Sequence, residues 1–150
     1  MNKKLLNSVA EDLLAIPPLI RRGINRKVVK AAFDKVGEGI GVPHFEIMMV
    51  LEEAGTQHIT EIGEKLLISR PQMTFLIDRL VSLEMVARRT DETDRRLSNI
   101  SLTDKGKAIL KEKDQVLRAN FTEKLSRLTD DELQQLAESL KGLKNILSRL

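Results

Sequence analysis

The spacing of apolar residues changes its period once along this chain, and that change constrains the fold more than any other feature. Over most of the 150 residues, apolar side chains recur every three or four positions, which is typical of one face of a helix. In contrast, residues 85–89 have an extended pattern and residues 97–102 alternate, with the polar sequence TDETDRR between them. The chain is therefore predicted to be mainly α-helical, with a small β-hairpin whose tip is long and charged.

Three helices are predicted shortly before the hairpin. Pro43 suits the first turn of one that ends at Gly55, and a short helix then covers the sequence TEIGEKLL. A very short strand, residues 57–59, is expected between them. Ser69 and Gln72 have the spacing of a capping box, so the third helix should begin at about residue 70. Its inward stripe is expected to consist of Met73, Leu76, Ile77, Leu80 and Leu83.

Long helices with apolar stripes are predicted at both ends of the chain. Residues 2–16 predict one helix, which Pro17-Pro18 is expected to interrupt because proline lacks an N–H donor, and a second helix should cover about residues 19–36. After the hairpin, a helix to about residue 128 is expected, and the last helix has leucines at heptad positions 133, 136, 140, 143, 147 and 150. We expect these terminal helices to form a homodimer interface; packing within one monomer is the alternative.

Composition excludes several classes of protein. There is no Cys, which excludes disulfide scaffolds, cysteine-ligated zinc and thiol chemistry. The absence of Trp and Tyr argues against a stacking platform for single-stranded nucleic acid. The two histidines, His44 and His58, have no carboxylate at a metal-ligand spacing, and neither a P-loop nor a Ser-His-Asp arrangement occurs. We therefore expect no enzyme activity, no metal and no cofactor.

Hydropathy and charge place further limits on location and partners. No apolar run approaches the roughly 20 residues that a membrane span needs. Polar residues at positions 7, 11 and 12 interrupt any signal-like stretch, so a cytoplasmic protein without a membrane partner is expected. The net charge is +3, but residues 60–106 hold eight basic and eight acidic side chains. Any binding to a polyanion must therefore depend on where individual charges lie.

The succession of a short helix, a tight turn, a capped helix and a charged hairpin indicates a winged helix-turn-helix. The sequences ITEIGEKLLISRPQMTFLIDRL and LEMVARRTDETDRRLSNISLTDKG, flanked by long helices, resemble the MarR family of transcription regulators. The most specific part is the Asp-x-Arg spacing of Asp94 and Arg96, followed by a strand and Leu102-Thr103. The resemblance implies a DNA-binding region at residues 42–103 and a helical dimerisation region at residues 1–36 and 104–150.

The same resemblance implies a function. It predicts a homodimeric, sequence-specific regulator that binds double-stranded DNA at a pseudo-palindromic operator. Such a protein would act as a repressor that a small aromatic or anionic effector releases. Two alternatives from other classes stay open: a winged-helix module for protein–protein association, and a small ligand-binding helical protein.

The helix that begins at about residue 70 would be the recognition helix of such a regulator. Its apolar stripe points inward, which leaves its polar residues for the outer surface. Arg can pair with guanine, Gln with adenine, and Thr or Phe can touch the thymine methyl group. Phe75 stays open between the core and DNA. The predicted DNA contacts are Ser69, Arg70, Gln72, Thr74 and Arg79. A solvated helix face is the alternative.

The hairpin would be the wing. By resemblance, Asp94 braces its turn and Arg96 enters the minor groove, where a narrow groove concentrates negative potential. The predicted wing residues are Arg88, Arg89, Asp94, Arg95 and Arg96. A charged turn with weak local salt bridges is the alternative.

Two further expectations concern an effector and a departure from the family. By resemblance, an effector would bind between the dimerisation and DNA-binding regions, and core packing is the alternative for the candidate pocket residues Phe33, His44, Phe45, Met48 and Met49.

Glu84 stands at the end of the recognition helix, where the family commonly has glycine. If that position is left-handed, Glu costs on the order of 1 kcal/mol more than Gly.

Overall fold

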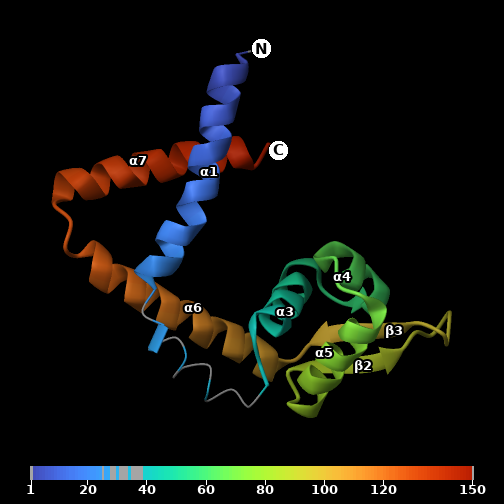
Figure 1. The fold of residues 1–150 in the computed structure, drawn as a ribbon. Coiled ribbons are helices and arrows are strands. Elements are labelled where there is room, and N and C mark those ends of the chain that lie inside the picture. Colours follow the sequence, from blue (N-terminus) through green and yellow to red (C-terminus); the bar gives the residue numbers. More distant parts are fainter. Residues whose placement is uncertain (1, 25, 28–29, 31–33, 35–38, 150) are drawn as a thin grey trace. The chain divides into compact units, whose positions relative to one another are not determined.

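The computed structural model describes residues 2–24, 26–27, 30, 34 and 39–149 (Figure 1). The chain divides into two units. We call residues 27–116 the central unit, and residues 1–26 together with 117–150 the terminal unit. Helices predominate, and the strands form one small antiparallel sheet. The predicted fold class is confirmed.

Three helices of the central unit form the helix-turn-helix region. They are α3 (Val42–Ala54), α4 (Ile59–Leu66) and α5 (Arg70–Ser82). Pro43 lies in the first turn of α3 and Gly55 follows its end, as predicted. Ser69 occupies the N-cap position of α5, but its hydroxyl makes no capping hydrogen bond within this fully described helix start. The predicted capping box at Ser69 and Gln72 is therefore wrong.

Three short strands complete the central unit. They are β1 (Gln57–His58), β2 (Val86–Thr90) and β3 (Ser98–Leu102). Because β3 pairs with both of the others, it is the middle strand. The β2–β3 register runs from Val86 opposite Leu102 to Thr90 opposite Ser98, so residues 91–97 form the hairpin tip. Figure 1 shows the hairpin extending beyond the helices of this unit.

The core of the central unit combines α3, α4, α5 and the sheet. Met73, Leu76, Ile77 and Leu80 of α5 are buried, which confirms the predicted inward stripe, and Leu83 is half-buried. They pack with the buried residues Ile47, Met48, Ile62, Met85 and Ile100. Burial of such side chains is the main favourable term in folding. This core holds α5 with its opposite face toward solvent.

Both helices of the helix-turn-helix end with a left-handed residue that is not glycine. After α4, Leu67 has φ 55°, and after α5, Glu84 has φ 60°. At the end of α5, the Glu84 N–H donates to the Val81 carbonyl and the Met85 N–H to the Leu80 carbonyl. This is the Schellman arrangement, in which glycine is preferred. Glu84 therefore carries the backbone cost expected from its place in the sequence.

The terminal unit contains two long helices and the second part of a third. They are α1 (Lys3–Gly23), α6 (Asp104–Leu125) and α7 (Asp130–Leu147). The first part of α6 belongs to the central unit, up to Val116. Thr129 and Glu132 form a capping box at the start of α7, since each accepts a hydrogen bond from the backbone N–H of the other.

The predicted break at Pro17-Pro18 is wrong, because α1 continues through both prolines to Gly23. Each proline removes one helical hydrogen bond, but its fixed φ of about −65° is itself helical. The bonds on either side keep the helix continuous. The second helix predicted over residues 19–36 thus begins inside α1, and most of its later residues lie outside the described part of the chain.

The helices α1 and α7 leave their apolar stripes open. Neither helix has a buried residue. Of the heptad leucines, Leu133, Leu136 and Leu143 are half-buried, while Leu140 and Leu147 are 45% and 43% exposed; position 150 lies outside the described residues. In the described part of the chain, no helix is long and apolar enough to cross a membrane.

Candidate nucleic-acid interface

Four of the five predicted recognition residues lie on the exposed side of α5 or at its start. Ser69, Arg70, Gln72 and Thr74 are all exposed. The Thr74 hydroxyl donates to the Arg70 carbonyl at 3.1 Å, which aligns it along the helix. Their exposure follows from the inward stripe, because residues between the core positions face solvent.

Arg79, the fifth recognition residue, is half-buried and turned toward the start of α3. A side chain at Gly39 would meet its Nε at 3.7 Å. Burial lowers the pKa of His44, and the nearby Arg79 charge lowers it further. The Arg79 guanidinium therefore lies near His44 on the inner side of α5, whereas the other four residues face solvent.

Phe75 lies on the outer face of α5, which it shares with the exposed residues Thr74 and Asp78. It is 71% exposed, an unusual place for a large aromatic ring. The structure therefore removes the core alternative for Phe75. Its ring is available to a partner on the same face as the recognition residues.

The predicted wing residues lie on the hairpin and its tip. Arg88, Arg89, Asp94, Arg95 and Arg96 are all exposed. Asp94 Oδ1 accepts the backbone N–H of Arg96 at 2.9 Å. Nη2 of Arg88 donates to Oδ1 of Asp78 at 2.6 Å, which joins β2 to the recognition helix.

A groove brings the recognition helix and the wing together. Its volume is about 210 Å³, and it is lined by Arg70 and Thr74 of α5, Arg88 of β2, Arg96 and Leu97 of the tip, and residues 58–60 and 98. Residues from four segments of the chain thus line one groove, and three of them are arginines. Arginine guanidinium groups bind phosphates and guanine edges with paired hydrogen bonds.

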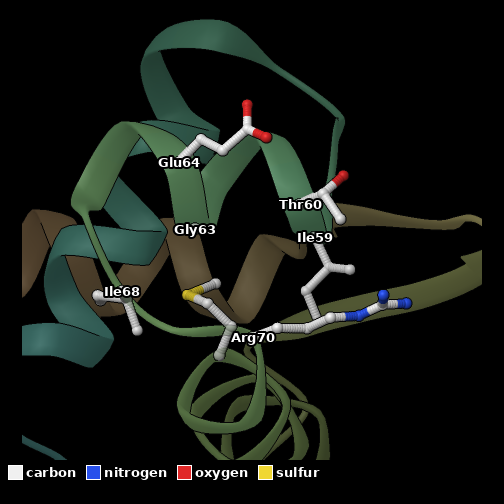
Figure 2. Close-up of a pocket in the computed structure, with 7 residues that line it drawn as sticks. Ile59, Thr60, Gly63, Glu64, Ile68 and Arg70 are labelled. Carbon is white, nitrogen blue, oxygen red and sulfur yellow. The ribbon is translucent and has the colours of Figure 1, made fainter.

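A second, more apolar pocket of about 160 Å³ lies between α4 and the start of α5. Figure 2 shows Ile59, Gly63 and Ile68 around it, with the Arg70 side chain extending past Ile59. A side chain on Gly63 would meet Met73 at 3.1 Å and the Ile68 carbonyl at 3.2 Å. Gly63 therefore allows the close approach of the two helices that places Arg70.

The candidate effector residues have mixed positions. His44, Phe45 and Met48 are buried, at 5%, 4% and 0% exposure, whereas Met49 is exposed. Nδ1 of His44 accepts the backbone N–H of Gly41 at 3.1 Å, a contact that fixes the start of α3. Phe33 lies outside the described residues. The effector pocket stays a prediction.

Two acidic residues with defined roles at this surface were missed in the sequence. Asp78 pairs with Arg88, and Asp91 accepts hydrogen bonds from several groups in the wing. For Asp91 a local signal exists, because Asp followed two residues later by Thr is typical of a turn closed by the carboxylate. For Asp78 there is none, since its partner is ten residues away on another element.

Comparison with known proteins agrees with this geometry. The family model "MarR family" matches residues 40–98. The HTH-type transcriptional regulator MhqR of Bacillus subtilis (strain 168) is 29% identical over 103 residues, which are 69% of this chain and 71% of that protein. The organic hydroperoxide resistance transcriptional regulator of the same organism is 30% identical over 117 residues, or 78% and 77% of the two chains.

A solved structure supports the fold. The transcriptional regulator Tm0710 from Thermotoga maritima superposes with a TM-score of 0.74 at 22% identity, over 95% of this chain and 96% of that one. The fold is that of a winged helix-turn-helix protein, and the family match and the relatives define a transcription regulator that binds DNA. The chain belongs to the MarR family.

Proposed function

We propose that this regulator is a homodimer that binds a pseudo-palindromic operator in double-stranded DNA and represses transcription. In this proposal α5 enters the major groove and the wing enters the adjacent minor groove. The observation that carries it is the groove shared by Arg70 and Thr74 of α5 with Arg88 and Arg96 of the wing. Because α5 and the wing line one groove, a single DNA duplex lying against it would contact both elements.

Each recognition residue has a chemical role in this proposal. Arg70 would read guanine and Gln72 adenine, while Thr74 and Phe75 would contact thymine methyl groups. The Ser69 hydroxyl makes no capping bond and would contact phosphate beside the start of α5. Arg96 would enter the minor groove, with Arg89 and Arg95 on the flanking phosphates. Arg79 contributes least, because its side chain is turned toward α3.

Dimerisation is supported by the open stripes of α1 and α7. We assign it to residues 1–36 and 104–150, and DNA binding to residues 42–103. In a two-fold symmetric dimer the two recognition helices would read half-sites about 34–36 Å apart, one turn of DNA. The operator would then repeat the same half-site on both strands.

Repression and its relief rest on the family likeness. A small aromatic or anionic effector would shift the spacing of the recognition helices and so lower operator affinity. Because the chain has no Cys, relief by thiol oxidation is not open to it. The natural location for such a protein is the cytoplasm, where its DNA lies.

A titration of DNA binding tests the proposal. The protein is titrated at several salt concentrations against the promoter of its own operon and against random DNA of equal length. Tight, specific binding with a two-to-one ratio of chains to operator is expected. Absence of binding at low salt would favour the protein–protein or ligand-binding alternatives. Addition of small aromatic carboxylates to the complex tests the effector.

A further inference from the structure

Asp91 organises the tip of the wing through hydrogen bonds from four donors. Its Oδ1 accepts the backbone N–H of Thr93 at 2.9 Å, the Thr93 hydroxyl at 2.6 Å and the backbone N–H of Asp94 at 3.0 Å. Its Oδ2 accepts the side-chain amide of Asn99 at 2.9 Å. A carboxylate has about four acceptor positions. Donors of the tip therefore occupy Oδ1 fully, and β3 supplies one donor to Oδ2.

The charge of Asp91 is turned into the wing. Its side chain is only 15% exposed, whereas the arginines of the hairpin are exposed. The Thr93 hydroxyl, and after it the other donors, hold the pKa of Asp91 well below its usual range. The carboxylate is therefore ionised. An exposed anion on this surface would repel phosphate, but this one is bonded to the wing itself.

Asp91 also lies where the tip meets the rest of the sheet. Its backbone N–H donates to the Leu97 carbonyl at 3.0 Å, which closes the tip. Nε2 of His58 lies 4.0 Å from Asp91 Oδ2, and His58 pairs with Asn99 across β1 and β3. Since His58 directly precedes α4, the carboxylate lies close to the start of the helix-turn-helix as well as within the hairpin.

We propose that Asp91 is a positioning residue for DNA binding, which sets the geometry of the tip and thereby directs Arg95 and Arg96 without touching DNA. This inference rests on the proposed function, because it requires the wing to contact DNA. It differs from what the family resemblance implies, where Asp94 braces the turn. In the hairpin described here, Asp94 accepts the Arg96 N–H, whereas Asp91 gathers four donors.

Three variants separate positioning from simple charge. The probe is a duplex that the wild-type protein selects from a random-sequence pool. Asp91→Ala should bind it about tenfold more weakly, which is the effect of one lost specific contact. Glu92→Ala is the matched control, since it removes the same charge from an exposed neighbouring position and should bind as tightly as wild type or more tightly. Asp91→Asn should recover most of the affinity, because its amide oxygen still accepts from the tip.

Two further measurements test the mechanism. In an Arg95→Ala/Arg96→Ala background, Asp91→Ala should cost little more, because a positioning residue acts through those arginines. Without DNA, amide hydrogen exchange at Thr93, Asp94 and Arg96 should be faster in Asp91→Ala and unchanged in Glu92→Ala. Equal thermal unfolding of the variants confirms that the core is intact.

The outcomes are distinct. If Asp91→Ala binds as tightly as Glu92→Ala, or loses as much affinity without the two arginines as with them, the positioning role is overturned. If the wild-type protein selects no duplex, the proposed function itself fails, and this result is obtained before any variant is compared.

Discussion

The two units of this protein use their apolar side chains in opposite ways. All fourteen buried apolar side chains in the described part of the chain lie in the central unit, between Phe45 and Leu110. In the terminal unit, α1 and α7 have no buried residue, and Leu14 and Leu140 are 77% and 45% exposed. One chain thus completes the core of the central unit but leaves the stripes of the terminal unit open.

The difference indicates what each unit requires. Burial contributes roughly 25 cal/mol for each Å² of apolar surface, so the central unit has its main stabilising term within one chain. In α1 and α7 no side chain is fully buried, so their stripes keep apolar surface that another surface could cover. A second copy of the same chain offers a matching stripe. Variants that disrupt each unit separately therefore test whether the two units have these different roles.

The largest effect is expected from charges on the stripe of α7. Leu140→Asp combined with Leu147→Asp should dissociate the proposed dimer completely at micromolar concentration, because an unpaired charge is costly to bury. Sedimentation velocity measures the assembly, and amide exchange should show the central unit still protected. Ser139→Asp combined with Asn145→Asp places the same charges at other exposed sites of α7 and should leave the dimer intact. If the wild-type protein is a monomer, a second copy does not cover the open stripes of the terminal unit.

A change in the wing should spare assembly and weaken DNA binding. Arg96→Ala should lower operator affinity by about 1–3 kcal/mol and reduce the salt dependence by about one phosphate contact. Arg70→Ala should instead change the preference among operator variants, because a base contact discriminates between sequences. Titration of both variants at several salt concentrations separates these effects. Wild-type affinity for Arg96→Ala throughout would show that the wing assignment is wrong.

A smaller effect is expected at Phe75. If its ring covers a thymine methyl group, replacing that thymine by uracil removes a contact of on the order of 1 kcal/mol, about fivefold in affinity. Uracil is placed at each thymine position of the operator in turn, and binding is measured with wild type and Phe75→Ala. The loss should appear at one symmetric pair of positions in wild type and disappear in the variant. Equal sensitivity of both proteins at every position would exclude the contact.

The smallest effect concerns the backbone of the central unit. Leu67→Gly and Glu84→Gly should each stabilise it by up to about 1 kcal/mol, because the steric cost of a positive φ that glycine removes exceeds the extra backbone entropy that glycine loses on folding. Leu67 is 93% exposed, so its side chain buries little surface. Leu67→Ala and Glu84→Ala are the controls, since they truncate the side chains but keep the strained conformation. Urea unfolding measures the four variants, and equal gains from Ala and Gly would show that strain is not the cause.

Local signals in the sequence were sufficient for the elements of the central unit. The change of period predicted the hairpin, Pro43 and Gly55 predicted the bounds of α3, and the stripe of α5 predicted its buried face. Such signals act between residues at most four positions apart, and the same residues form the helix or strand whatever surrounds them. For that reason the resemblance to the MarR family was also visible in the sequence.

Tertiary structure decided which partners the side chains meet. Asp78 pairs with Arg88, Asp91 accepts from Asn99 and lies near His58, and Arg79 turns toward α3. Each of these contacts joins residues at least eight positions apart, in different parts of the fold. A periodic pattern within one helix or strand therefore cannot predict them. Tertiary structure also decided that α1 continues through Pro17-Pro18. There the hydrogen bonds of the surrounding helix outweigh the local preference of proline against a helix interior. Sequence alone determined the elements and their faces, and only the packed chain determined how the wing is held, because contacts between distant elements form when the core brings them together.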